Sequence, residues 1–318
     1  MTIFVEQAAL IMSVQDSGRF GFLRFGLPES GPVDWWAFRA ANRLVNNPPD
    51  TAEMEIGFSN AGLRIEKEAI IAVCGAGYRV FLNEKPLPLW MAFLARKGDR
   101  LFLEKCSGGN WVTLAVSGGV RSQVWMGSRS VYPKAGLGGL LKDGDRLPIA
   151  EANVNSRRLA GRSYTKSGQP SYGEDILIKA IPGPQYQRFT SESQLAFWHQ
   201  AFSVTSRSDR MGYRLAGRKL SREKGSEMVS QGMVLGQIQV PPDGQPIVMM
   251  PDHPTTGGYP SIGVISRVDL PLIAQAEPGS SSVKFKLINI NEAQKQLVEA
   301  LYHIDRVESP EEEQWMNL

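Results

Sequence analysis

The polar residues best suited to chemistry gather between Ser206 and Gly263. This stretch contains SRSDRMGYR and, after a spacer, GQIQVPPDGQPIVMMPDHPTTGGYP, and the segments around both motifs have the apolar pattern of buried strands. Buried polar side chains cost free energy unless they pair with one another or with a ligand. The stretch therefore indicates either an internal polar network or a binding site.

Two arginines of the first motif, Arg210 and Arg214, are candidates for binding a substrate carboxylate. A guanidinium group that is fixed beside a strand suits a bidentate contact with a carboxylate. The alternative is an internal ion pair with Asp209 or Asp252. Arg210 is also a candidate for stabilising the negative charge that develops during a reaction.

The second motif supplies a possible acid–base group and a possible anion-binding loop. Asp252 precedes His253, and a neighbouring carboxylate can fix the tautomer of a histidine and raise its basicity. Together with Arg210, these two residues are the predicted catalytic set. Residues 255–258 could direct backbone N–H groups toward a carboxylate, a phosphate or an oxyanion, or could form a tight hairpin. The predicted substrate-binding residues are Arg214, Gln239, Thr255, Thr256, Gly257, Gly258 and Tyr259.

Four further candidates lie in the N-terminal half. Arg19, Asp34 and Asn42 occupy loop and helix positions from which they could reach the same cleft or a partner. Glu55 is a lone carboxylate on a predicted strand, and its alternative role is that of a buried structural acid. The sequence has no HExxH, no GxSxG, no phosphate-binding loop and no clustered Cys/His set, so we expect no metal site.

The elements that must position these residues are predicted to be mostly strands. The 318 residues include 32 glycines and 20 prolines, which predicts many tight turns between short strands. Strand-like segments begin, among other places, at Glu53, Ala69 and Trp111, and they follow one another without long helices between them. This pattern is typical of an antiparallel barrel or sandwich. The predicted class is mainly β with a few short helices.

Three helices are expected. The apolar spacing predicts one that starts at Asp34 and carries Asn42 on its open face. A capping box predicts a second helix at Ser191, and a third is expected near the C-terminus with Asn291 as its N-cap. The residues predicted to form the buried stripes of the second and third helices are Leu195, Trp198, Phe202, Leu297, Leu301 and Ile304.

A polar, aperiodic segment at 151–172 marks the expected connection between two halves. The predicted organisation is a β-rich half with one helix at 1–160, a barrel at 173–290, and a helix with an acidic tail at 291–318. The net charge of +3 is small and both signs are interspersed, so we expect neither nucleic acid nor a membrane as partner. The N-terminus lacks the pattern of a signal peptide, and we expect a cytoplasmic protein.

Ordered motifs throughout the chain resemble those of one protein family. They include QDSGRFGFLRFGLPESGPVDWW, EMEIGF, CGAG, LAVSGGV, MGSRS, LKDGDRLP, SDRMGYR and TTGGYP, and together they span roughly residues 8–285. The family is that of the 5-oxoprolinase C subunits, also labelled the biotin-dependent carboxyltransferase family, allophanate hydrolase subunit 2 or the KipA type. One departure is Pro254, where many members have glutamine.

The resemblance implies cyclophilin-like β-barrel units in two halves. It also implies a component, inactive alone, of an ATP-dependent complex that hydrolyses the small molecule 5-oxo-L-proline to L-glutamate. The implied partners are a KipI-like B component and an A component of the LamB/YcsF type, and ATP is not expected to bind to this chain alone.

Two alternatives come from the same resemblance. The first is a component of a biotin-dependent carboxyltransferase, because the same fold forms that domain in urea carboxylase. It would need a biotin carrier, since this chain contains no biotin-accepting lysine motif. The second is a KipA-like regulator that binds a KipI-like kinase inhibitor.

Overall fold

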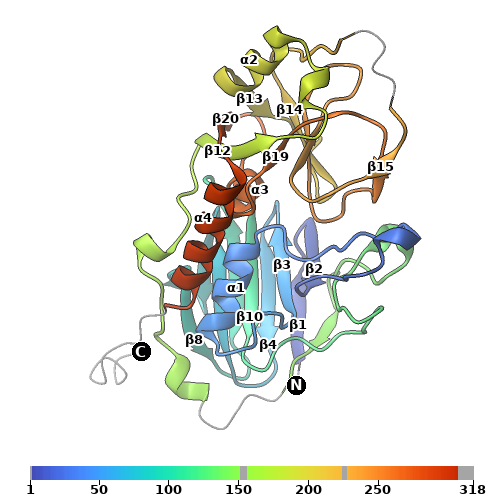
Figure 1. The fold of residues 1–318 in the computed structure, drawn as a ribbon. Helices are drawn as coiled ribbons and strands as arrows, with labels where there is room; N and C mark the ends of the chain where they lie inside the picture. The colour runs from blue at the N-terminus through green and yellow to red at the C-terminus, as the bar shows by residue number, and fades with distance from the viewer. Residues whose placement is uncertain (1, 151–155, 224–227, 307–318) are drawn as a thin grey trace. The chain divides into compact units, whose positions relative to one another are not determined.

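The computed structural model describes residues 2–150, 156–223 and 228–306, and the chain divides into two compact units (Figure 1). Unit 1 comprises Met1–Arg19, Ser30–Pro170 and Leu301–Leu318, and unit 2 comprises Phe20–Glu29 and Ser171–Ala300. Strands dominate both units, so the predicted mainly β class is confirmed. No helix among the described residues has the length and apolar character that a membrane crossing requires.

Unit 1 is built from two antiparallel sheets whose apolar faces share one core. The six-stranded sheet has the order β11 (Arg146–Pro148), β1 (Thr2–Gln7), β4 (Ala61–Ile65), β9 (Arg100–Lys105), β6 (Tyr78–Leu82) and β7 (Lys85–Leu87). The five-stranded sheet has the order β2 (Ile11–Gln15), β3 (Glu53–Gly57), β10 (Trp111–Val116), β5 (Ala69–Gly75) and β8 (Met91–Ala95). Val5, Leu103, Met54 and Leu114 belong to the shared core, whose burial supplies the main favourable free energy of folding.

One helix, α1 (Trp35–Leu44), covers the second face of the five-stranded sheet at β5 and β10. The Asp34 carboxylate accepts a hydrogen bond from the backbone N–H of Ala37 at 2.9 Å and so caps the helix start. Phe38 and Leu44 are buried. The helix that the apolar spacing predicted after Asp34 is confirmed.

Unit 2 contains a closed barrel of seven strands. Their order is β12 (Asp175–Pro182), β19 (Ser261–Ile265), β16 (Gln237–Gln239), β17 (Ile247–Met249), β14 (Gly212–Ala216), β13 (Ala201–Val204) and β20 (Ser282–Leu287). β12 and β20 pair in parallel and close the barrel, whereas the other pairs are antiparallel. A short ribbon of β15 (Gln231–Gly232) and β18 (Thr256–Gly257) accompanies it. Closure leaves the barrel without an open sheet edge.

Two helices of unit 2 correct or extend the predictions. α2 (Ser191–His199) is capped by Thr190, whose hydroxyl accepts from the backbone N–H of Ser193, so the predicted capping residue, Ser191, was wrong by one position. Its buried face is formed by Ala196 and Phe197, whereas Leu195 is 63% exposed. The predicted buried stripe was therefore rotated, because a polar Ser193 rather than Leu195 packs inward. α3 is short and spans Leu270–Gln275.

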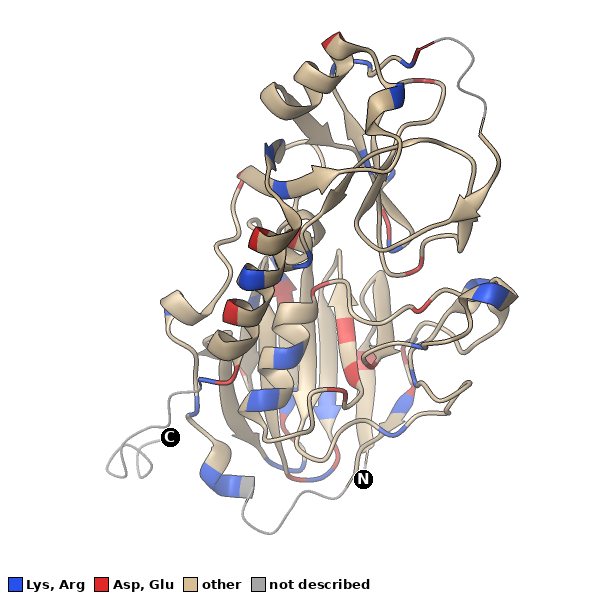
Figure 2. Ribbon diagram, in the orientation of Figure 1, with Lys and Arg blue, Asp and Glu red and all other residues tan. Residues whose placement is uncertain are grey.

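The last helix, α4 (Ile290–Ile304), begins with a capping box, but at a different residue from the predicted one. The Asn289 side chain accepts from the backbone N–H of Glu292 at 2.9 Å, and the Glu292 carboxylate accepts from that of Asn289 at 3.0 Å. Asn291 is exposed and makes neither contact. Residues of both charge signs lie along α4 (Figure 2).

The remaining short elements are 3₁₀-helices at Leu23–Phe25, Pro133–Ala135, Ser156–Leu159, Lys166–Gly168, Tyr186–Arg188 and Arg267–Asp269. Part of the predicted connection, residues 151–155, and the predicted acidic tail from residue 307 onward lie outside the described residues.

Candidate functional site

A buried ion pair forms the centre of the polar residues in unit 2. β14 and β17 pair in antiparallel register, and the backbone N–H of Asp252 donates to the carbonyl of Arg210 at 2.9 Å just beyond their ends. The Arg210 guanidinium donates to both carboxylate oxygens of Asp252, at 2.9 and 3.2 Å. Both side chains are 8% exposed. The internal pair that the sequence left as an alternative is thus the one observed.

His253 lies directly beside this pair and is buried. Its Nδ1 lies 2.7 Å from the Pro254 carbonyl oxygen, which can only accept a hydrogen bond, so Nδ1 carries the proton and Nε2 the lone pair. Burial lowers the pKa of His253, against the opposing effects of the Pro254 carbonyl and the carboxylates of Glu29 and Asp252. The geometry gives a neutral imidazole that can accept a proton at Nε2.

The predicted role of Asp252 in orienting this histidine was wrong. Both oxygens of Asp252 accept from Arg210, and the main-chain carbonyl of Pro254 fixes the tautomer instead. Asp252 lies in a turn in which the backbone N–H of His253 donates to the Met250 carbonyl at 2.9 Å, so these neighbours in sequence do not meet through their side chains.

The centre of the segment at residues 255–258 is a short strand. Thr256 and Gly257 form β18, which pairs with β15 through the registers Gly232 to Thr256 and Gln231 to Gly257. Neither Gly257 nor Gly258 has φ in the left-handed region. An N–H nest of the kind that holds phosphate needs one residue there, so this segment does not fit the phosphates of a nucleotide. The predicted tight hairpin is also not what the chain forms.

A buried amide packs directly onto this ribbon. Gln239 is 3% exposed, and its Nε2 donates to the Tyr259 carbonyl at 3.2 Å. A Cβ atom at Gly257 would lie 2.8 Å from Gln239 Nε2 and 2.5 Å from Met233 Sδ, so a larger residue there would have to displace the ends of these two side chains. Tyr259 is 45% exposed at the end of the ribbon. The structure thus brings Gln239, Gly257 and Tyr259 together.

Arg214 lies apart from these buried groups. It is exposed in β14, whereas its neighbours Tyr213 and Leu215 are buried, as the alternation of a strand requires. Its predicted partnership with Arg210 in one carboxylate site has no support from this orientation.

The candidates of the N-terminal half belong to unit 1, and Arg19 anchors a hairpin there. Its side chain is 1% exposed and donates to the carbonyls of Trp125, at 3.1 Å, and Ser130, at 2.5 Å. The nearby Asp16 carboxylate accepts from both Ser128 and Ser130 hydroxyls, at 2.6 and 2.7 Å. The motifs QDSGR and MGSRS therefore lock each other in place.

Asn42 and Asp34 are likewise built into the scaffold. Asn42 is fully buried, donates to the Thr51 carbonyl at 2.8 Å and accepts from the Asn47 side chain at 2.9 Å. Its predicted place on the open face of α1 was wrong, because the loop after the helix folds back over it. Asp34 caps α1.

Glu55 is buried on β3, and it is not a lone carboxylate. Its Oε2 accepts from the backbone N–H of Val33 at 2.7 Å. Glu53, two residues earlier on the same face, is 1% exposed and accepts from the Thr113 hydroxyl. Burial raises the pKa of Glu53 well above its usual value, with the Thr113 hydrogen bond acting in the opposite direction and the charge of Glu55 adding to the rise. Glu53 is therefore a carboxyl group that folding favours in the protonated form.

The raised pKa of Glu53 predicts a pH-dependent loss of stability that Glu53→Gln should remove. Below the pKa of the unfolded state, about 4.3, both states hold the proton. As pH rises toward the folded-state pKa, only the unfolded chain releases it, so the wild type loses stability while the glutamine variant does not. In thermal unfolding, we expect the difference in Tm between variant and wild type to grow as the pH rises above the pKa of the unfolded state. The exposed Glu84→Gln is the matched control, and a Tm difference independent of pH would contradict the assignment.

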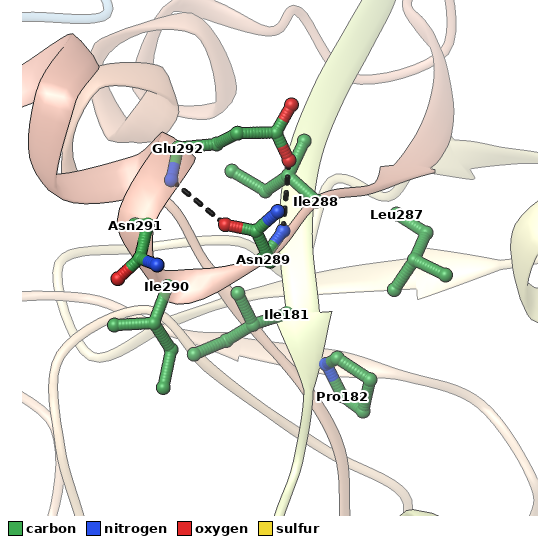
Figure 3. Close-up of a pocket in the computed structure, with 8 residues that line it drawn as sticks. All are labelled: Ile181, Pro182, Leu287, Ile288, Asn289, Ile290, Asn291 and Glu292. Atoms are coloured by element: carbon green, nitrogen blue, oxygen red, sulfur yellow. Dashed lines mark hydrogen bonds between the residues drawn. The ribbon is translucent and has the colours of Figure 1, made fainter.

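A separate pocket of about 600 Å³ lies between the end of β12 and the start of α4 (Figure 3). Its lining residues are Ile181, Pro182, Leu287, Ile288, Asn289, Ile290, Asn291 and Glu292. The side chains of Asn289 and Glu292 are occupied with the start of the helix. The pocket contains none of the candidate site residues, and its lining is mostly apolar.

Sequence reasoning missed Asp16 and Glu53. It also missed the hydrogen bonds that join the motifs QDSGR and MGSRS in unit 1. A signal was present for Glu53, because EMEIG places two carboxylates at alternate positions of a strand whose other positions are apolar. For Asp16 the signal was the concentration of serines in MGSRS, far away in the sequence.

Comparisons with known proteins agree with the resemblance carried by the motifs. The family model for the carboxyltransferase domain, subdomain A and B, matches residues 25–287 of this chain. The C subunit of 5-oxoprolinase from Escherichia coli is 38% identical over 295 residues, which cover 92% of this chain and 93% of that protein. The protein of the same name from Haemophilus influenzae is 33% identical over 287 residues, covering 89% and 90%.

A solved structure of larger size has the same fold. The crystal structure of Kluyveromyces lactis urea carboxylase matches 96% of this chain with a TM-score of 0.89 and 27% identity. This chain spans only 29% of that one. The chain therefore belongs to the family of carboxyltransferase domains, subdomain A and B, that includes the C subunits of bacterial 5-oxoprolinase.

Proposed function

We propose that this chain is the C subunit of an ATP-dependent 5-oxoprolinase that hydrolyses 5-oxo-L-proline to L-glutamate. The observation that carries the proposal is the 38% identity to the Escherichia coli protein, which extends over nearly the full length of both chains. Because that relative is named as one subunit of an enzyme, we propose that this chain is inactive alone. Its proposed partners are a KipI-like B component and a LamB/YcsF-like A component, assembled in the cytoplasm.

The proposed catalytic group of this chain is His253. Opening a lactam requires a proton to be removed from the attacking water and another to be delivered to the departing nitrogen. A neutral imidazole with Nε2 available is suited to the first of these transfers. The Arg210–Asp252 pair fixes the backbone segment that carries His253. We therefore assign these two residues the role of positioning the imidazole. The buried Gln239 amide, packed on Gly257, is the proposed contact of the substrate's own amide.

ATP is the proposed energy source of the complex, because nitrogen donation into the carbonyl makes a lactam a poor electrophile. The backbone at Gly257 and Gly258, where neither residue has φ in the left-handed region, does not fit nucleotide phosphates. This supports placing ATP mainly on a companion protein of the complex, and we derive no step through it from the residues of this chain.

The test is glutamate release from 5-oxo-L-proline and ATP by the complex reconstituted from this chain and its A and B components. We expect turnover with all three chains and background glutamate release when this chain is omitted. Equal release without this chain, or none with it, would overturn the proposal.

A carboxyltransferase is the second candidate, and the fold match to urea carboxylase favours it. It would require a biotin carrier supplied by another chain. Transfer of a labelled carboxyl group from carboxybiotin to an acceptor amide, measured with this chain and a biotinylated carrier, would support it, and the oxoprolinase assay would then be negative.

A further inference from the structure

We infer that Glu29 is a positioning residue of the His253 site, where its carboxylate stabilises the imidazolium that forms when Nε2 takes a proton. Glu29 is not among the residues that the sequence indicated. The inference rests on the proposed function of His253 as the base that activates water, and it names the group that favours this proton transfer. Both residues belong to unit 2.

The segment that carries Glu29 packs with the barrel unit. Phe20–Glu29 belongs to unit 2, whereas the residues on both sides of this segment belong to unit 1. The backbone at Glu29 is fixed from both directions. Pro28 is buried and its ring fixes φ, and Ser30 is buried with φ of 57°. The glutamate is therefore held in place within the unit that contains His253.

Two carboxylates act on the imidazole of His253. Asp252 is its neighbour in sequence, but both oxygens of Asp252 accept from the Arg210 guanidinium, so this pair has no net charge. The charge of Glu29 raises the pKa of His253, and its effect is larger than that of Asp252. Because the interaction between charges weakens with distance, so large an effect requires the Glu29 carboxylate to lie near the ring. Glu29 therefore provides the uncompensated charge of this cluster.

The Glu29 carboxylate is half-buried, and among the described residues neither a hydrogen bond nor an ion pair is found for it. A carboxylate that has lost part of its hydration is stabilised by a nearby cation. Neutral His253 does not provide that cation, whereas protonated His253 does. The arrangement therefore favours transfer of a proton to Nε2, and it opposes the effect of burial on the same imidazole.

In the proposed reaction, Nε2 of His253 accepts a proton from water while the oxygen of that water forms a bond to the lactam carbonyl carbon. The carbonyl oxygen takes the electron pair of the C=O π bond, and the imidazole becomes a cation. When the C–N bond breaks, the proton on Nε2 passes to the departing nitrogen. Glu29 exchanges no proton in these steps. Its charge lowers the free energy of the imidazolium, so Glu29 acts through His253 and not on the substrate.

The interaction can be measured on the full chain without companion proteins. The pKa of His253 is read from the pH titration of its imidazole nitrogen NMR signals, which His253→Asn assigns among the three histidines. Glu29→Gln removes the charge at nearly constant size, so the pKa of His253 should fall below the wild-type value. The exposed Glu174→Gln, in the same unit, is the matched control and should leave that pKa unchanged. Equal pKa values of His253 in Glu29→Gln and the wild type would overturn the inference.

Two further measurements separate the charge of Glu29 from the shape of its side chain. Glu29→Asp keeps the charge, so the pKa of His253 should be higher in this variant than in Glu29→Gln. Salt should reduce the difference between the wild type and Glu29→Gln, because the Debye length falls from about 10 Å at 0.1 M to about 3 Å at 1 M ionic strength. If Glu29→Asp matched Glu29→Gln and salt had no effect, altered packing would explain the shift and the inference would fail.

The role in turnover is tested in the reconstituted complex. Glu29→Gln should lower kcat by about 2- to 5-fold with little change in KM, as expected for the loss of an ion pair between partly exposed groups. It should also move the acidic limb of the pH profile to lower pH, because the imidazole then stays neutral to a lower pH. A lowered pKa of His253 with unchanged turnover and pH profile would refute the role in catalysis. If the wild-type complex releases no glutamate, the proposed function fails, and the NMR titration still decides whether Glu29 stabilises the imidazolium.

Discussion

Replacing Arg210 by alanine is expected to destabilise unit 2 by about 3–5 kcal/mol, because the Asp252 carboxylate would be left buried without its partner. The two side chains are almost inaccessible to water, and each end of the pair holds a backbone segment at the ends of β14 and β17. Urea unfolding, followed by tryptophan fluorescence, measures the loss as a lower midpoint.

Arg214→Ala is the matched control for this prediction. Arg214 lies on the same strand but is exposed, and its replacement should change the free energy of unfolding by less than about 0.5 kcal/mol. If both arginine variants unfolded at the same urea concentration, the buried Arg210–Asp252 pair would not stabilise unit 2 as predicted.

A double variant separates positioning from chemistry. Replacing a buried ion pair with apolar residues of similar volume is often neutral for stability, so Arg210→Met combined with Asp252→Leu should recover most of the lost free energy. A folded double variant that assembles and turns over normally would show that the pair only supports its neighbours. A folded, assembled double variant without turnover would show that catalysis needs the pair itself, as the positioning of His253 requires.

Local patterns predicted the elements of this chain well. Strand-like segments bounded by turn residues predicted β3, β5 and β10, which are buried along their whole length, and the helical spacing after Asp34 predicted α1. The helix starts at Ser191 and Asn291 were predicted one or two residues away from the observed caps. Several polar residues near a helix start can each act as the cap, and the tertiary contacts select among them.

Side-chain partnerships were much harder to predict. The sequence left Asp252 with two possible partners, its neighbour His253 and Arg210, and the antiparallel pairing of β14 and β17 brings Arg210 to it from 42 positions away. Asn42 was predicted to lie on an open face because the spacing of apolar residues shows only which side of the helix faces the sheet. It does not show that the following loop covers the other side, where Asn42 donates to the Thr51 carbonyl. Such contacts depend on strand register and loop closure, which a single sequence does not display.

Replacing His253 by asparagine is expected to lower turnover of the assembled complex by about 10²- to 10⁴-fold, the usual contribution of general acid–base catalysis. The asparagine amide can still donate to the Pro254 carbonyl, as Nδ1 does, but it provides no basic atom in place of Nε2. Stability should therefore change little while the rate of glutamate release falls. His199→Asn is the matched control, since His199 is exposed on α2 and its Nδ1 likewise contacts a carbonyl, that of Leu195, at 3.1 Å.

The pH profile gives this prediction a second, independent readout. Because burial lowers the pKa of His253 below 6.5, the imidazole stays neutral at pH values where an exposed histidine is partly protonated. A base of this kind loses activity as pH falls through its lowered pKa, so the acidic limb of the wild-type profile should lie below pH 6.5. An acidic limb above that value, or normal turnover by the assembled His253→Asn variant, would remove His253 from the mechanism and leave the catalytic base to a companion protein.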